Sequence, residues 1–391
     1  MNMIIIGAGE CGTRAAFALR EAGFSGAVTL IGAEHGLPYE RPPLSKPDGD
    51  GVQRKTICDQ AALEGAGIAY MPGTTIAAID PALRIVRLAD RELPYDKLLI
   101  ATGAQPRRLT CPGAEHALDF RSHADAARVF AGATGPVAII GAGLIGMELA
   151  AVLRARGLPV TVIELGPAPL GRAVPPRFAA RLHQRHETEG VRFHFGQAIA
   201  GIDAAGVTLA DGTHIPATLT VSAIGVVPDL GLASLAGLAV GNGILINARL
   251  QTSDPHIFAA GDCAAIAGQR YETWRNARDQ AQIAALNMLG QAQDFAALPW
   301  FWSDQYDLGL QVVGTPQDAP ILRSHPDGTE IEFHLQGDRL IAAAGLGRGN
   351  AVARDIKLAE MLIAGGQSVD AASLADPSVG LKSLLKARKA A

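Results

Sequence analysis

The feature that most constrains this chain is a glycine pattern that occurs twice. G-x-G-x-x-G recurs with one offset of 134 residues at all three glycines, which are Gly7, Gly9, Gly12 and then Gly141, Gly143, Gly146. Each copy follows a short apolar run, residues 4–6 in the first and 137–140 in the second, of the kind that forms a buried parallel strand. A repeat of this kind predicts two related domains.

Each glycine of the pattern has its own physical task. The first permits a tight turn, the second lets a pyrophosphate approach the backbone, and the third lets a helix pack close to the strand. We expect these helices over residues 13–22 and 144–156, each with its positive N-terminal end toward the phosphates. Two such units predict two Rossmann-like domains, and two dinucleotides in one chain usually means a flavin and a nicotinamide. The alternative is a glycine-rich turn in another α/β fold.

Composition narrows the class of protein further. The 391 residues suffice for two or three domains, and the net charge of −4 gives no basic field for nucleic acid. No apolar run reaches the ~20 residues of a membrane helix. The first strand begins within a few residues of Met1, which leaves no room for a signal peptide. We therefore expect a cytoplasmic protein with no membrane or nucleic-acid partner.

The four cysteines, Cys11, Cys58, Cys111 and Cys263, form no close pair. This pattern is consistent with a reducing compartment. It argues against a flavin disulfide reductase, which needs two neighbouring thiols, and against a zinc or iron–sulfur site.

Several predicted strands end in residues suited to contact a ligand. Thr102-Gly103 follows the apolar segment 96–101, and Gly225 follows segment 219–223 in the second half. A glycine there allows close approach of a ligand to the backbone. Asp262 follows segment 257–260, where a carboxylate can bind a sugar or ribityl hydroxyl or cap a following helix.

The carboxylates after the second strands indicate which nicotinamide binds. Glu164 ends the strand predicted over 160–163, where it can accept hydrogen bonds from an adenosine ribose and repel a 2′-phosphate. Leu165 follows, where an NADP site often has arginine, so we expect NADH. In the first unit Gly32 occupies the matching position and Glu34 comes two residues later. We expect Glu34 to hold the FAD ribose from this shifted position.

The remaining patterns suggest three domains. We expect an FAD-binding domain over 1–110 and 236–298, an NAD-binding domain over 111–235, and a smaller α+β domain over 299–391. All three tryptophans lie between Trp274 and Trp302, with more aromatic residues nearby. Such a cluster suits stacking on flavin and nicotinamide rings, or an ordinary aromatic core between domains.

Five motifs in order carry a family resemblance. They are ERPPLSK (40–46), ATG (101–103), GAGLIGMELA (141–150), IFAAGDC (257–263) and PWFWSDQY (299–306). Together they make the chain similar to the FAD-dependent NADH:ferredoxin reductases of oxygenase systems, of which putidaredoxin reductase and the biphenyl dioxygenase reductase are models. The resemblance spans nearly the whole chain and implies a glutathione-reductase-like architecture with non-covalent FAD.

The resemblance also implies roles for individual residues. Arg41 and Lys46 would contact the flavin, with Lys46 near its N5 atom and paired with Glu148. Ala101, Thr102, Gly103 and Asp262 would also line the FAD site, and Trp302 would lie beside the ring. Gly225, Glu272 and Trp274 would lie near the nicotinamide. Two departures from the family pattern are the segment after Lys46 and Asp229 after Pro228.

The activity that this resemblance implies is hydride transfer from NADH to FAD and single-electron transfer to a [2Fe–2S] ferredoxin. That ferredoxin would serve a cytochrome P450 or a Rieske oxygenase. Alternatives are a rubredoxin reductase, an NADH oxidase or peroxidase that uses one cysteine such as Cys58, and a redox-responsive interaction protein like apoptosis-inducing factor.

Overall fold

The computed structural model describes residues 1–47, 51–171, 173–296 and 298–386. The chain divides into two compact units. Unit 1 comprises Met1–Leu44, Gln53–Gln105 and Val226–Ala297, and unit 2 comprises Ser45–Val52, Pro106–Gly225 and Leu298–Ala391. Each unit holds one copy of the glycine pattern. The three-domain division remains a prediction.

The centre of unit 1 is a five-stranded parallel sheet. Its order is β19-β7-β1-β2-β3, with bounds Ile257–Ala259, Lys97–Ile100, Asn2–Ile6, Ala27–Ile31 and Ile68–Met71. The strands of this sheet are mostly apolar, as is typical of a parallel sheet, and every residue of β1 after Asn2 is buried. Strand β19 shows that the segment after residue 226 returns to the sheet that Met1–Leu44 begins.

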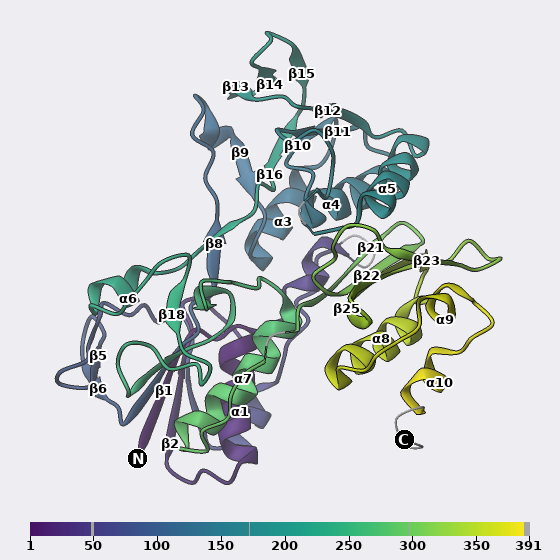
Figure 1. Ribbon diagram of the computed structural model, residues 1–391. Coiled ribbons are helices and arrows are strands. Elements are labelled where there is room, and N and C mark those ends of the chain that lie inside the picture. The colour runs from purple at the N-terminus through teal and green to yellow at the C-terminus, as the bar shows by residue number, and fades with distance from the viewer. Residues whose placement is uncertain (48–50, 172, 297, 387–391) are drawn as a thin grey trace. The chain divides into compact units, whose positions relative to one another are not determined.

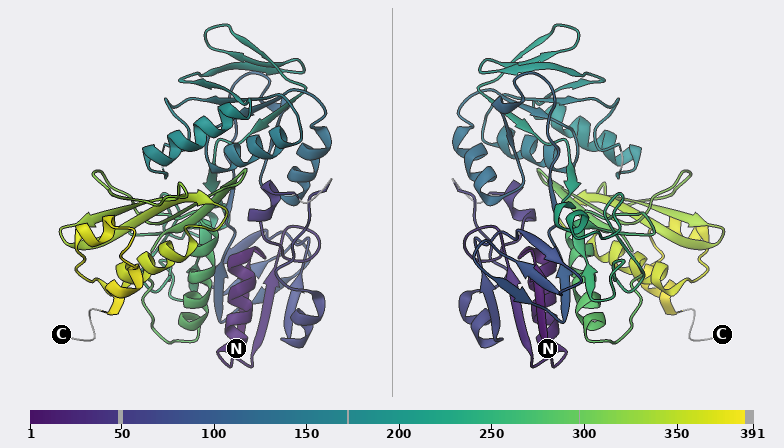
Figure 2. Two further views of the ribbon diagram at one scale, coloured as in Figure 1. Left: turned by 90° about the vertical axis from the view of Figure 1, so that its right-hand side faces the viewer. Right: turned by 90° about the vertical axis from the view of Figure 1, so that its left-hand side faces the viewer.

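Two helices of unit 1 lie side by side against this sheet (Figure 1; Figure 2). Helix α1 spans Glu10–Glu21 and helix α7 spans Trp274–Met288. Helix α1 begins three residues before the predicted start at residue 13, because the third glycine is inside the first turn and the helix begins directly after Gly9. Sequence analysis expected a helix soon after Asp262 without giving its bounds, and α7 begins only at Trp274.

Smaller elements complete unit 1. An antiparallel sheet contains β4 (Ala78–Asp80), β5 (Ile85–Arg87) and β6 (Glu92–Pro94). Strand β18 (Ile244–Ile246) pairs with β20 (Ala264–Ile266), and β8 (Ala104–Pro106) pairs with β17 (Val226–Pro228). The short helices are α2 (Gln60–Gly65), α6 (Gly231–Leu235) and the 3₁₀ turns η1 (Pro42–Ser45) and η3 (Gly261–Cys263).

Unit 2 contains a second five-stranded parallel sheet. Its order is β12-β11-β10-β16-β9, with bounds Arg192–Phe195, Val160–Glu164, Val137–Ile140, Leu219–Ser222 and Ala117–Asp119. Its helices are α3 (His123–Gly132), α4 (Leu144–Ala155), α5 (Pro176–Thr188) and the turn η2 (Ala114–His116). A small antiparallel sheet contains β13 (Ile199–Asp203), β14 (Gly206–Leu209) and β15 (His214–Pro216). The registers of β10 with β11 and of β1 with β2 are both parallel, as the repeat requires.

The rest of unit 2 is an antiparallel sheet with helices. The sheet order is β21-β22-β25-β24-β23, with bounds Trp300–Gln305, Leu308–Gly314, Arg339–Arg348, Glu330–Gln336 and Ile321–Ser324. Helix α8 (Ala353–Gly365) packs on β22 and β25. The short helices α9 (Ala371–Ala375) and α10 (Leu381–Lys386) follow it (Figure 1). Strand β21 packs on α4, which brings the PWFWSDQY motif to the second glycine unit.

Candidate functional site

The first and third glycines of each pattern are required by close backbone packing. A Cβ on Gly12 would lie 1.8 Å from the carbonyl oxygen of Gly7, and a Cβ on Gly146 would lie 2.0 Å from that of Gly141. A Cβ on Gly7 would in turn lie 2.1 Å from the carbonyl oxygen of Ala101. A side chain at any of these positions would push the helix away from its strand, so both units need glycine there.

The middle glycine of each pattern has the opposite environment. A Cβ on Gly9 or on Gly143 would meet no protein atom within 4 Å. Both residues are also the N-cap positions of α1 and α4, and neither helix has a side-chain cap. The first backbone N–H groups of each helix therefore receive no hydrogen bond from an N-cap side chain, and the space beside the N-cap glycine is open, an arrangement suited to a phosphate.

The carboxylate of Glu164 lies over the second glycine loop. One of its oxygens accepts a hydrogen bond from the backbone N–H of Ala142 at 2.8 Å, and the other accepts from Gly166 at 2.7 Å. Glu164 is the last residue of β11, so the strand fixes its position. This places an anion beside the loop where an adenosine ribose would be held.

The first glycine unit lacks a carboxylate at the equivalent position. Gly7 donates to the carbonyl of Ile31 just as Gly141 donates to that of Ile163, each at 2.8 Å, so Gly32 is the structural counterpart of Glu164. A Cβ on Gly32 would lie 2.8 Å from the Cβ of Ala8. The carboxylate of this unit therefore comes later, at Glu34.

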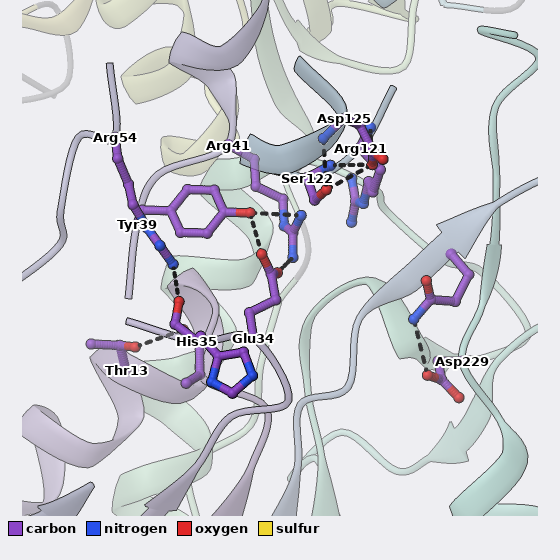
Figure 3. A network of polar contacts seen from close by, with 12 residues as sticks. Thr13, Glu34, His35, Tyr39, Arg41, Arg54, Arg121, Ser122, Asp125 and Asp229 are labelled. Atoms are coloured by element: carbon purple, nitrogen blue, oxygen red, sulfur yellow. Dashed lines mark hydrogen bonds and ion pairs between the residues drawn. The ribbon is translucent and has the colours of Figure 1, made fainter. Parts of the chain in front are cut away.

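Glu34 is held by two side chains of the proline-rich loop that follows it (Figure 3). Its carboxylate accepts hydrogen bonds from the hydroxyl of Tyr39 at 2.6 Å and from the guanidinium of Arg41 at 2.7 Å. The guanidinium groups of Arg41 and Arg54 lie 5.5 and 4.6 Å from the centre of the Tyr39 ring, and Arg54 also donates to the backbone of His35. These contacts fix the loop relative to β2. The structure thus brings Glu34 and Arg41 together, which sequence analysis did not predict.

The Thr102-Gly103 turn after β7 is tied to Asp229, the residue noted as a departure from the family pattern. The Thr102 hydroxyl donates to the carbonyl of Asp229 at 3.0 Å, and the backbone N–H of Asp229 donates to that of Gly103 at 3.0 Å. The Asp229 carboxylate accepts from Gln105 at 3.3 Å. Gly103 has φ +74°, and a Cβ there would meet nothing within 4 Å, so this turn leaves space for a ligand.

Asp262 and Glu272 lie in unit 1 and share one neighbour, Arg270. The Arg270 guanidinium donates to the carbonyl of Asp262 and forms an ion pair with Glu272. Asp262 lies in the short turn η3, and strand β20 follows it. The expectation that Asp262 caps the next helix is wrong, because α7 begins at Trp274 and Thr273 is its N-cap.

A cluster of polar and charged side chains forms in unit 2 around the buried Glu148 of α4. Its carboxylate is 5% exposed and accepts hydrogen bonds from the hydroxyls of Ser45 at 2.5 Å and Ser303 at 2.7 Å. The ammonium of Lys46 lies 3.8 Å from Glu148 and 2.6 Å from Asp304. Lys46 therefore lies between two carboxylates, of which Asp304 is the nearer. Burial raises the pKa of Glu148, and the Lys46 ammonium and the two hydroxyls oppose that rise.

Trp302 lies beside the same cluster. Its ring stacks on Trp300 with centres 5.3 Å apart, and the Lys46 ammonium lies 5.5 Å from its centre. Trp274 is in unit 1, so the predicted aromatic cluster is divided between the two units. Gly225 follows β16 in the chain, and its carbonyl accepts a hydrogen bond from the backbone N–H of Arg107.

Sequence analysis missed three polar members of this cluster, Ser45, Ser303 and Asp304. They stand inside the ERPPLSK and PWFWSDQY motifs. Strand alternation was the signal available, because residues two apart on a strand share a face. On β21 that alternation places Ser303 and Gln305 inward, and both are buried.

Comparison with known proteins identifies the family. The pyridine nucleotide-disulphide oxidoreductase model matches residues 1–281, and the reductase C-terminal model matches residues 300–385. The chain belongs to this family. It is 39% identical to the ferredoxin–NAD(+) reductase component of an anthranilate 1,2-dioxygenase system from Burkholderia cepacia, over 98% of both chains. It is 35% identical to putidaredoxin reductase from Pseudomonas putida, over 100% of this chain and 98% of that one.

Solved structures agree with the sequence comparison. The ferredoxin reductase for the CYP199A2 system of Rhodopseudomonas palustris superposes with a TM-score of 0.92 at 34% identity, covering 98% of this chain and 100% of that chain. The reductase in a covalent putidaredoxin reductase–putidaredoxin complex superposes with a TM-score of 0.91 at 33% identity, covering 100% and 99%. The chain is therefore a flavoprotein oxidoreductase of the ferredoxin reductase group, and the predicted α/β fold is confirmed.

The family implies that the chain binds FAD and NAD(P)H. The residues present fit two such dinucleotides, because each unit offers an uncapped helix N-terminus beside a glycine with open space around it. All four cysteines are free, and Cys11 and Cys263 are buried. Among the described residues, no helix combines the length and the apolar character that crossing a membrane requires.

Proposed function

We propose that the chain is an NADH-dependent reductase of a [2Fe–2S] ferredoxin that serves a P450 or Rieske oxygenase. The observation that carries this proposal is the pair of open glycine cradles, one in each unit, with an anionic Glu164 over the second. Relatives named for dioxygenase and P450 systems, aligned over nearly their whole length, support the oxygenase context.

The cradle of unit 1 is proposed for FAD. Its glycines would take the pyrophosphate, Glu34 and Arg41 would lie toward the adenosine side, and the Ala101–Gly103 turn and Asp262 would line the rest. Trp302 would lie beside the flavin ring. Bound FAD supplies a ring that accepts a hydride and releases electrons one at a time. The family resemblance implies that Lys46 would offer a cation to the negative charge that develops there, and within unit 2 its ammonium is paired with Asp304 at 2.6 Å and Glu148 at 3.8 Å.

The cradle of unit 2 is proposed for NADH, with Gly225 and Glu272 near the nicotinamide. Glu164 presents an acceptor-only carboxylate, which suits a ribose with free hydroxyls and repels a 2′-phosphate. The next residue, Leu165, is exposed and offers no positive charge to such a phosphate. NADH is therefore the expected donor.

The structure gives no support to a mechanism that uses Cys58. Burial and the neighbouring Asp59 raise the pKa of the Cys58 thiol, so the reactive thiolate is disfavoured at neutral pH. A reductase that passes electrons from the flavin directly to a protein partner needs no such thiol.

Steady-state turnover of the FAD-loaded protein tests the proposal. We expect NADH to support rapid reduction of a [2Fe–2S] ferredoxin, NADPH to be a poor donor, and Cys58→Ser to behave like the wild type. Oxygen consumption that is fast without ferredoxin and lost in Cys58→Ser would instead show an oxidase or peroxidase. Equal rates with NADH and NADPH would contradict the role of Glu164.

A further inference from the structure

A chain of buried polar side chains in unit 2 ends on Glu148. It begins at Tyr306, whose hydroxyl lies 3.2 Å from Nδ1 of His186. Nε2 of His186 lies 2.9 Å from Oε1 of Gln305, Nε2 of Gln305 lies 3.2 Å from the hydroxyl of Ser303, and that hydroxyl lies 2.7 Å from Glu148. The four inner residues are each at most 5% exposed. They come from three elements, α4, α5 and β21 (Figure 1).

The direction of every hydrogen bond in this chain follows from the charge at its inner end. An ionised Glu148 can only accept, so the single proton of the Ser303 hydroxyl points to it. The Ser303 oxygen can then only accept from the amide N–H₂ of Gln305. That orientation turns the Gln305 oxygen toward His186, whose Nε2 must donate, and leaves Nδ1 to accept from the hydroxyl of Tyr306.

The middle of the chain needs a neutral histidine, and the surroundings of His186 supply one. Burial lowers the pKa of His186 to about 4, against a smaller opposing effect of the hydrogen bond to Gln305. The charged and titratable groups near the ring include Tyr306, His183, Arg185 and Glu189. At neutral pH the ring therefore has one donor and one acceptor nitrogen, as the chain requires.

The chain is unsuited to carrying protons to or from Glu148. An amide neither gains nor loses a proton at neutral pH, so Gln305 interrupts proton transfer between His186 and Ser303. What the chain can transmit is orientation, because reversing one hydrogen bond reverses the next. Loss of the donor on Gln305 would free the Ser303 hydroxyl to turn away from the carboxylate.

We propose that His186 and Gln305 are positioning residues that, through Ser303, commit one hydrogen bond to Glu148 and so hold this buried carboxyl in its ionised form beside Lys46. The inference rests on the proposed role of Lys46 and Glu148 next to the flavin. The other groups that face Glu148 are Ser45, which donates a second hydrogen bond, and Asp304, whose negative charge acts in the opposite sense. The orientation of the Ser303 donor depends on the buried chain through Gln305 and His186.

Titration of Glu148 by NMR tests this inference on the full-length, FAD-loaded, oxidised protein. With ¹³C at the glutamate carboxyl carbon, the resonance that is missing in Glu148→Gln identifies Glu148. We expect Ser303→Ala to move its titration midpoint upward by about one pH unit, since a hydrogen bond to a charged group is lost. Gln305→Met should move it in the same direction by less, and Ser303→Thr, which keeps the hydroxyl, should restore the wild-type value.

Ser222→Ala is the matched control. Ser222 is a buried serine of unit 2 whose hydroxyl has no hydrogen-bond partner in the structure, and it lies outside the chain that leads to Glu148. Its removal should leave the Glu148 midpoint unchanged. If Gln305→Met does not fold, His186→Phe takes its place, because Phe193 and Tyr306 already surround that ring with aromatic contacts.

An unchanged Glu148 midpoint in Ser303→Ala, or in both Gln305→Met and His186→Phe, overturns the inference. A variant that is merely less stable would lower the melting temperature without moving the midpoint. The outcome is also separable from the proposed function. If the Glu148 midpoint shifts in the variants but the wild-type protein does not reduce ferredoxin, the inference stands and the proposed function fails. If the wild type reduces ferredoxin but the Glu148 midpoint does not shift in the variants, the proposed function stands and the inference fails.

Discussion

In the two glycine units, the same three positions are fixed by the same steric demands. An added Cβ would strike backbone at the first and third glycines and would meet open space at the second, in unit 1 and in unit 2 alike. The charged groups differ. The first helix has Glu10 and Arg14 where the second has Leu144 and Glu148, given the constant offset between the units. The backbone of the repeat thus provides for a pyrophosphate in each unit, and the side chains around it give each unit its separate task.

The carboxylates after the second strand differ in the same way. Glu164 bonds to the backbone of its own glycine loop, whereas Glu34 is held by Tyr39 and Arg41 of the next loop. In unit 2 the end of β11 and two backbone N–H groups, those of Ala142 and Gly166, hold the carboxylate. In unit 1 the side chains of Tyr39 and Arg41 from the proline-rich loop hold the Glu34 carboxylate, so the position of this carboxylate depends on that loop.

The largest expected effect comes from the third glycine. Gly12→Ala and Gly146→Ala each place a Cβ against a carbonyl oxygen and should destabilise their own unit by about 3 kcal/mol. We expect Gly12→Ala to lose FAD, and Gly146→Ala to keep FAD but no longer be reduced by NADH. The flavin-to-protein absorbance ratio and NADH-driven bleaching measure the two effects.

The middle glycines provide the control for this prediction. Gly9→Ala and Gly143→Ala meet no protein atom, so their melting temperatures in the absence of cofactor should match the wild type while affinity for the respective dinucleotide falls. If Gly12→Ala and Gly146→Ala affected FAD content equally, the assignment of one cofactor to each unit would be wrong.

A smaller effect is expected from the carboxylates. Replacing Glu164 by alanine and Leu165 by arginine removes the anion and adds a cation at the ribose position. The ratio of kcat/KM for NADPH to that for NADH should then rise by about 100-fold. Glu34→Gln is the matched change in unit 1 and should weaken FAD retention without altering that ratio. A change of nicotinamide preference in Glu34→Gln would contradict the comparison.

Arg14 and Glu148 occupy equivalent positions in the two units. Substituting them should give the smallest effects, and only the effect on stability at Glu148 should depend on pH. The folded-state pKa of Glu148 is raised, so its protonated form favours folding below about pH 4, and that contribution is lost as the pH rises through the raised value. Glu148→Gln should therefore gain stability relative to the wild type as the pH rises from about 4.5 through the raised pKa of Glu148.

Arg14→Gln removes one ion pair within α1, with Glu10 at 2.9 Å, in which the side chains of Arg14 and Glu10 are 35% and 9% exposed, and should lose about 0.5 kcal/mol. Its difference from the wild type should not vary over that pH range. Thermal melting of the two variants at several pH values makes the comparison, and a pH-independent difference for Glu148→Gln would show that its carboxyl is not perturbed.

The sequence was most informative where backbone geometry follows from residue type. The glycine offset located the two strand–turn–helix units, because close packing at Gly12 and Gly146 leaves no room for a side chain, and β10 begins and ends where expected. It was less informative for side chains brought together from distant segments. The contacts of Glu148 with Ser45 and Ser303 span 103 and 155 residues, and no local pattern reports such a distance.

The bounds of helix α7 were missed for a related reason, although a helix after Asp262 was expected. Its buried face consists mainly of alanine and polar residues such as Asn276 and Gln280, so it has no strong apolar periodicity. Its small buried residues let α7 pack close to α1. The motif residues 299–306 were noted for their aromatic rings, while the inward-facing Ser303 and Gln305 between them attracted no prediction.

The most direct test of the whole account is an anaerobic titration of the FAD-loaded protein with NADH, followed by addition of oxidised [2Fe–2S] ferredoxin. The account predicts that equimolar NADH bleaches the flavin, and that ferredoxin restores the colour with two reduced ferredoxins formed per flavin. A flavin that NADH does not bleach, or a bleached flavin that ferredoxin leaves unchanged, would contradict it.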